Sequence, residues 1–164
     1  MRSFLTAILS AMLATAPQHG YPQSSEYERA QIVVARNLLM HDLQTAYFNL
    51  FKVKNKKSDD YQSAADTARS MPDIMDEFLL LLPPETAKGE APGSRVKPEV
   101  WTDASAFATA AELLKAQALA LAEIADSGDS EAYSVAFGLL TEACTGCHGL
   151  RPSSGGAFRF AVDE

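Results

Sequence analysis

Apolar and polar positions along the chain repeat with the period of a helix. No glycine or proline interrupts residues 23–71, and such a stretch favours helix. Its first half carries one stripe of residues spaced three or four apart, as a 3.6-residue period requires. The stripe consists of Ile32, Arg36, Met40, Leu43, Tyr47 and Leu50. Polar residues from Lys52 to Asp60 then break the pattern and predict a turn between antiparallel helices.

A second helix is predicted to begin near Tyr61, because a new apolar stripe starts there and runs to Leu82. Pro72 lies inside this stripe. A proline removes one backbone donor and clashes with the preceding turn. We therefore expect the helix to kink at Pro72, or to restart there with Ser70 as its new N-cap.

The segment 83–98 contains four prolines and two glycines, which predicts a long irregular crossover. A third amphipathic stripe follows, with Thr102 or Asp103 as its N-cap, and it ends at Gly128. Asp129 or Ser130 can open a fourth helix, which Gly149 stops.

These four segments predict an all-α fold, because no part of the chain alternates with period two in β-branched residues. We expect an antiparallel four-helix bundle over residues 26–152, with one long crossover between the second and third helices. Residues 153–164 begin Ser-Ser-Gly-Gly and offer neither a cap nor a stripe. This segment is predicted to be a flexible tail outside the core.

Residues 1–16 have the form of a secretory signal peptide. Arg2 is followed by an apolar run from Phe4 to Ala16, which ends in a small-x-small cleavage pattern. Pro17 would hinder cleavage at this point, so the cut is placed between residue 16 and about residue 25. A membrane anchor is the alternative, but the run is shorter than the ~20 residues that span a bilayer. We expect an exported, periplasmic protein whose mature form has no membrane span.

The overall composition narrows the class of partner. With 164 residues, 47% of them hydrophobic and 21% charged, the chain matches one soluble globular domain. Its formal net charge of -7 would repel a phosphate backbone, so nucleic acid is not an expected partner. The chain shows no Ser/His/Asp set, paired carboxylates or phosphate-binding glycine loop. We therefore do not expect an enzyme.

The strongest chemical signal is the run Cys144-Thr145-Gly146-Cys147-His148, the attachment pattern of a c-type haem. Positions i, i+3 and i+4 share one face of a helix. Both sulfurs can then reach the two vinyl groups at one edge of a porphyrin. The pattern predicts one haem c, covalently bound through two thioethers on Cys144 and Cys147, with His148 as the proximal ligand of the iron.

Three other uses of the two cysteines are weaker. A thioredoxin-type dithiol needs its thiolate at a helix N-terminus, whereas this pair closes the last helix, where the helix dipole raises thiol pKa values. A structural zinc ion needs four ligands, and only His19 and His41 remain outside the motif. A disulfide within one helix is geometrically awkward and gives His148 no role.

Four further motifs lie before the cysteines in the sequence. They are Arg36-Asn37-Leu38-Leu39-Met40, the crossover run Lys97-Pro98-Glu99-Val100-Trp101-Thr102-Asp103, Ser127-Gly128-Asp129 and Ala136-Phe137-Gly138. With the haem motif on the last helix, this set resembles the cytochrome c′ and cytochrome c-556 family over roughly residues 26–148. The chain departs from the family at Pro152, where many members carry a basic residue.

The resemblance implies roles for two residues of the first helix. Met40 would face the distal side of the haem, and Arg36 would pair with a haem propionate. A methionine in this place implies six-coordinate iron with His148 and Met40 as ligands, and therefore a carrier of single electrons to a redox partner protein. The resemblance also implies that such chains can pair as homodimers through the first two helices.

Other roles stay open at this point. Methionine on a helix stripe ordinarily fills the core, and a buried arginine can extend its guanidinium to solvent. Without a bond from Met40, the resemblance implies five-coordinate iron that binds nitric oxide or carbon monoxide. A haem-free helical interaction module is a further alternative. His41 lies about 100° around the helix from Met40 and is expected at the surface.

Overall fold

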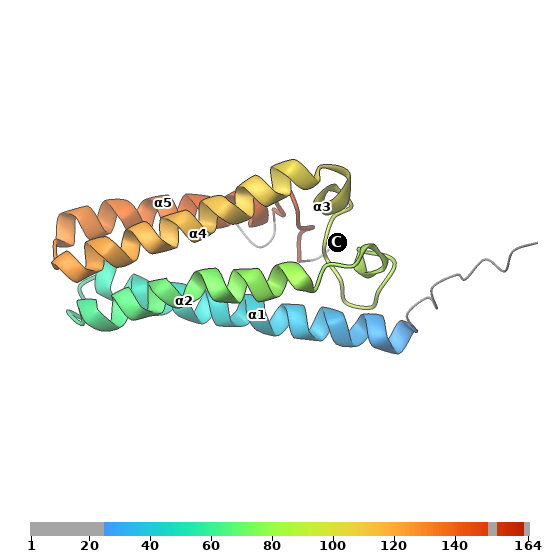
Figure 1. Ribbon diagram of the computed structural model, residues 1–164, viewed down its shortest axis with the longest axis horizontal. Helices are drawn as coiled ribbons and strands as arrows, with labels where there is room; N and C mark the ends of the chain where they lie inside the picture. Colours follow the sequence, from blue (N-terminus) through green and yellow to red (C-terminus); the bar gives the residue numbers. More distant parts are fainter. Residues whose placement is uncertain (1–24, 151–153, 163–164) are drawn as a thin grey trace, which may run out of the picture.

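The computed structural model describes residues 25–150 and 154–162, and within them the fold is an antiparallel bundle of four long helices (Figure 1). Two short helical turns lie in the connection between the second and third long helices. The elements are α1 (Glu26–Lys54), α2 (Tyr61–Leu80), η1 (Pro84–Thr86), α3 (Glu99–Thr102), α4 (Ala104–Ser127) and α5 (Ser130–His148). The predicted all-α class and the long crossover are confirmed.

Each of the four long helices begins at a side chain that accepts hydrogen bonds from its first turn. Ser25 and Glu28 form a reciprocal capping box at α1, with N···O distances of 3.2 and 2.6 Å. Asp103 caps α4 and Asp129 caps α5. Each of them is one of the two residues predicted for its position. Gly128 ends α4 in the left-handed region, at φ +70°, which favours glycine.

The predicted restart of the helix at Pro72 is wrong, and a kink at this residue stays a prediction. The helix α2 continues through this residue from Tyr61 to Leu80. Ser70 is not an N-cap, because its hydroxyl donates to the carbonyl oxygen of Thr67 within the same helix. The packing of neighbouring helices compensates for the one backbone hydrogen bond that a proline removes.

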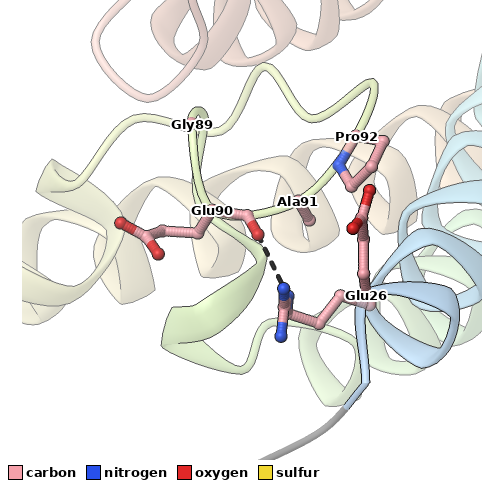
Figure 2. Close-up of a pocket in the computed structure, with 6 residues that line it drawn as sticks. Glu26, Gly89, Glu90, Ala91 and Pro92 are labelled. Carbon is pink, nitrogen blue, oxygen red and sulfur yellow. Dashed lines mark hydrogen bonds between the residues drawn. The ribbon is translucent and has the colours of Figure 1, made fainter.

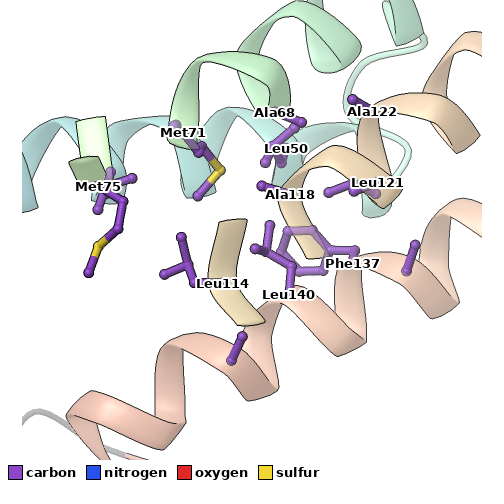
Figure 3. Packing of buried hydrophobic residues seen from close by; sticks show 14 of the residues in the cluster. Leu50, Ala68, Met71, Met75, Leu114, Ala118, Leu121, Ala122, Phe137 and Leu140 are labelled. Carbon is purple, nitrogen blue, oxygen red and sulfur yellow. The ribbon is translucent and has the colours of Figure 1, made fainter. Parts of the chain in front are cut away.

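The core is built from the inward stripes of all four long helices. Alanines are frequent along α2 and α4, so these two helices can approach closely. Figure 3 shows leucine and methionine side chains filling the space between them. The largest fully buried apolar side chains are those of Tyr133, Leu50, Met71, Leu121, Leu140 and Val33. Burial of this apolar surface is the main term that stabilises the bundle.

The crossover is held at several points by hydrogen bonds. The indole nitrogen of Trp101, in α3, donates to the carbonyl oxygen of Leu82 over 2.8 Å and ties the end of the crossover to the end of α2. The backbone nitrogen of Lys88 donates to the carbonyl oxygen of Val96 over 2.9 Å. The crossover is therefore a folded segment, in spite of its prolines and glycines.

The prediction of a flexible tail is wrong for residues 154–162. Val96 of the crossover and Arg159 form an antiparallel bridge. Phe158 packs against the core cluster with its ring edge-on to Phe107, at a centroid distance of 5.1 Å. Ala161 is buried. We therefore assign residues 154–162 to the folded domain and name them the C-terminal segment.

The predicted signal peptide, residues 1–16, lies outside the described residues. None of the helices described is long and apolar enough to cross a membrane.

Candidate functional site

The three residues of the haem motif lie on the last turn of α5. The helix ends at His148, and Gly149 follows at φ +77° with its N–H bonded to the carbonyl oxygen of Thr145 over 2.7 Å. Cys144, Cys147 and His148 are each partly buried. The motif therefore lies at one end of the bundle, between the core and solvent.

The two thiols are free and held in their neutral form. No disulfide joins Cys144 to Cys147. Burial, with a smaller contribution from the nearby Cys147, raises the pKa of the Cys144 thiol to about 11. Burial also raises the pKa of Cys147. Since a redox dithiol needs a stabilised thiolate, this environment speaks against the thioredoxin-like alternative.

His148 presents a neutral imidazole. Burial, with smaller contributions from the positive charges of Arg159 and Arg95, lowers its pKa to about 4. Within residues 25–150 and 154–162, its side chain makes no hydrogen bond. A neutral imidazole with a free nitrogen lone pair is the form that binds a metal.

The motif therefore fits a covalent haem c. It offers two unpaired thiols three residues apart and a neutral imidazole next to the second. In the described part of the chain, no three histidine, cysteine, aspartate or glutamate side chains gather into a metal site of another kind. A c-type haem takes one histidine as an axial ligand of its iron and two cysteines as the sulfurs of its thioether bonds.

On the first helix, Met40 lies where a residue of the bundle interior is expected. It is partly buried and packs against the core cluster, as does Cys144 of α5. It follows the buried Arg36 by one helical turn and precedes the buried Leu43. His41 is exposed, as predicted. Ligation of iron by Met40 stays a prediction.

Arg36 is buried and its guanidinium is bonded to the crossover. It is only 2% exposed, so the alternative in which it extends to solvent is wrong. Nη1 donates to Leu81 O over 3.2 Å and to Thr86 Oγ1 over 2.9 Å, and Nη2 donates to Thr86 O over 3.2 Å and to Ser94 Oγ over 3.0 Å. Burial lowers its pKa to about 10, which leaves it charged at neutral pH.

These bonds give Arg36 a structural task. They hold η1 and the following loop against α1, and the hydroxyl of Ser94 adds a bond of 2.6 Å to Thr86 O. Four of the five N–H groups of an arginine are occupied in this way. A haem propionate would therefore compete with Thr86 and Ser94, and the propionate role stays a prediction.

The sequence analysis did not predict that Thr86 and Ser94 bond to Arg36. It also did not predict that Arg95 and Arg159 lie beside His148. Thr86 and Ser94 lie in the irregular crossover, where no period marks a buried residue. Phe158 and Phe160 were the available signal for the C-terminal segment, because two aromatic residues so close together seldom remain in solvent.

A separate hollow of about 420 Å³ lies between the start of α1 and the loop 89–92 (Figure 2). Glu26, Arg29 and Glu90 line it, and Arg29 Nε donates to Glu90 O over 3.0 Å. None of the haem motif residues is among those that line it.

Comparison with known proteins identifies relatives of the whole bundle. The family model described as Cytochrome C′ matches residues 31–150. The cytochrome c′ of Rhodocyclus tenuis is 30% identical over 111 residues, which is 64% of this chain and 83% of that protein. The cytochrome c′ of Alcaligenes xylosoxydans xylosoxydans is 32% identical over 56 residues, or 34% of this chain and 44% of that protein.

Solved structures share the fold at lower identity. The cytochrome c′ of Rubrivivax gelatinosus has a TM-score of 0.64 at 24% identity, and the match covers 80% of this chain and 96% of that one. A variant of the cytochrome c prime of Alcaligenes xylosoxidans, solved as its nitric oxide complex, has a TM-score of 0.66 at 20% identity over 80% and 95% of the two chains.

Proposed function

The chain belongs to the cytochrome c′ family, and on that premise we propose that it holds one haem c and binds nitric oxide or carbon monoxide at the iron. When bound, the haem would supply an iron that can take a small gas molecule as a ligand. We propose binding and not catalytic turnover. The observation that carries the proposal is the neutral, partly buried His148 directly after Cys144 and Cys147.

Each residue of the motif has a separate task in this proposal. Cys144 and Cys147 supply the sulfurs of two thioether bonds, so the haem stays attached when its iron ligands change. His148 supplies the proximal nitrogen, and burial keeps that nitrogen unprotonated. The gas-binding role is supported by relatives of the same fold, because variants of the Alcaligenes xylosoxidans protein are solved with nitric oxide and with carbon monoxide.

A second candidate function is electron transfer with Met40 as the sixth ligand of the iron. The position of Met40 favours it, because this thioether is partly buried on the inward stripe of α1, one turn after Arg36. A soft thioether ligand stabilises ferrous iron and raises the reduction potential. In this case the chain would pass single electrons to a redox partner protein.

Mass spectrometry and optical spectra test the two functions. Protein expressed with the haem maturation machinery should carry the mass of one haem, and Cys144→Ala or Cys147→Ala should leave it on a single thioether. A high-spin ferric spectrum supports the gas binder, and a low-spin spectrum with a methionine-to-iron charge-transfer band supports the carrier. Protein without a haem mass would contradict both functions.

Substitution of Met40 separates the candidates further. Met40→Leu keeps the volume of the side chain and removes its sulfur. If Met40 binds the iron, this variant becomes high-spin, whereas Met75→Leu does not. Met75 is a matched control, because it is a buried methionine of another helix, 3% exposed. Identical spectra of the wild type and Met40→Leu would exclude ligation by Met40.

We also propose that the protein is exported to the periplasm and that residues 1–16 form its signal peptide. The mass of the mature chain locates the cut. A homodimer is a further proposal, supported by the exposed Val34, Leu38 and Phe48 along one face of α1. Light scattering of the purified protein gives the number of chains.

A further inference from the structure

Two segments that are far apart in sequence meet beside the end of α5. These are residues 94–97 of the crossover and the C-terminal segment. The N–H of Phe160 donates to Arg95 O over 2.9 Å, and the N–H of Lys97 donates to Phe158 O over 3.1 Å. The N–H of Phe158 donates to Cys147 O over 3.3 Å. The C-terminal segment is thus fixed both to the crossover and to the haem motif itself.

Four basic residues meet in this arrangement: Lys88, Arg95, Lys97 and Arg159. The two lysines have partners there. Their ammonium groups lie 4.4 and 5.2 Å from the ring centroid of Phe160, and Lys97 Nζ also donates to Gly156 O over 2.8 Å. This concentration of positive charge stands out in a protein whose formal net charge is -7.

The two arginines differ from the lysines in having no partner for their charge. Arg95 and Arg159 are partly buried, and neither guanidinium makes an ion pair or a hydrogen bond with the residues that the structure describes. The two residues are neighbours, because the backbone of Phe160 bonds to Arg95 O and Arg159 forms a bridge with Val96, and the same segment bonds to Cys147 O. Two neighbouring, partly buried cations are costly unless an anion lies between them.

We propose that Arg95 and Arg159 bind the propionate carboxylates of the haem. This inference rests on the proposed function, since it requires a haem at Cys147 and His148. A haem carries two carboxylates, and an arginine can hold a carboxylate through two parallel hydrogen bonds. Arg36, by contrast, already donates four hydrogen bonds to the protein. Arg159 lies beyond residues 31–150, the part of the chain that matches the family model.

Glycines allow the C-terminal segment to reach the motif. A Cβ atom added at Gly156 would lie 2.3 Å from Cys147 O and 2.5 Å from the carbonyl carbon of His148. These are backbone atoms, so the segment would have to move away. Gly156→Ala therefore displaces Arg159 without changing its charge.

The test is the midpoint reduction potential of the full-length haem protein, measured as a function of pH. Arg95→Gln and Arg159→Gln each remove a cation beside a propionate, so ferric haem becomes more stable and the potential shifts to lower values. The propionate pKa rises in the same variants, and the fall of the potential with increasing pH moves to higher pH. Arg69→Gln is the matched control, because Arg69 pairs with Asp66 and Asp126 on the outside of the bundle.

We expect Gly156→Ala to reproduce the shift of Arg159→Gln, and Arg159→Lys to give a smaller shift than Arg159→Gln. Potentials and pH profiles that match those of Arg69→Gln would overturn the inference while the haem mass, measured on the same samples, upholds the proposed function. A wild-type protein without haem mass would overturn both.

A free anion from solution could bind the two arginines in place of the propionates. Added phosphate distinguishes the two cases. We expect phosphate, added at constant ionic strength, to leave the wild-type potential unchanged, because the propionates occupy both arginines. A phosphate-dependent shift in the wild type that disappears in Arg159→Gln would overturn the assignment to propionates.

Discussion

The two ends of the bundle are built in different ways. At one end, α1 joins α2 and α4 joins α5 through short turns, and the polar groups there are caps and exposed ion pairs (Figure 1). At the other end, the crossover bonds to Arg36 of α1 and to the C-terminal segment, which in turn bonds to Cys147 O at the end of α5. We name these the turn end and the site end. The haem motif lies at the site end only, and a buried hydrogen-bond network around Arg36 stabilises that end as well.

The largest effect on stability is expected at the site end, from Arg36→Met. The substitution removes a buried guanidinium and the hydrogen bonds that it donates to Leu81 O and to the hydroxyl oxygens of Thr86 and Ser94. Thr86 O loses one of its two donors and keeps the Ser94 hydroxyl. Breaking a buried charged network of this kind costs about 4 kcal/mol in the free energy of unfolding. Urea denaturation measures it. Arg69→Ala, which removes only exposed pairs, should cost less than about 1 kcal/mol.

Leu121→Ala tests the interior of the turn end. Leu121 is fully buried in α4, and removal of its side chain leaves a cavity that costs about 3 kcal/mol. The haem spectrum should stay the same as in the wild type. A changed spectrum in this variant would show that the two ends are coupled, and would contradict the separation of the turn end from the site end.

Tyr133→Phe gives a smaller, pH-dependent effect. Tyr133 donates to Leu50 O over 3.1 Å, and its loss should cost about 1 kcal/mol at neutral pH. Burial is the main cause that raises the pKa of Tyr133 to about 12, above its ordinary value near 10. The folded state therefore favours the neutral phenol. The wild type should lose stability as the pH rises from 10 to 12, and Tyr133→Phe should lose less over the same range.

Gly128→Ala is expected to cost about as little as Tyr133→Phe. Gly128 has φ +70° and nothing within 4 Å of an added Cβ, so the cost is backbone strain alone, about 1 kcal/mol. Thermal unfolding measures it. A loss as large as that of Leu121→Ala would contradict this assignment.

The same division explains what could be predicted from the sequence. The helices follow from local signals, such as the stripe on α1, the caps Asp103 and Asp129, and the stop at Gly128. The restart predicted at Pro72 was wrong because the cost of a proline is local, while its compensation comes from neighbouring helices. At the site end, Cys144, Cys147 and His148 form a contiguous motif, so that part of the site was predictable.

The remainder of the site end depends on contacts between distant segments. Arg36 meets Ser94 across 58 positions of sequence, and Phe158 and Phe160 bond to the backbone of the crossover. Backbone hydrogen bonds of this kind carry no side-chain pattern. For the same reason, nothing in the sequence indicated that Arg95 and Arg159 lie beside His148.

The most direct test of the central claim is a titration of the ferrous protein with carbon monoxide, followed by its optical spectrum. We predict a new, saturable haem spectrum at one carbon monoxide molecule per chain. A haem-bearing protein whose ferrous spectrum stays unchanged in excess carbon monoxide would contradict the account.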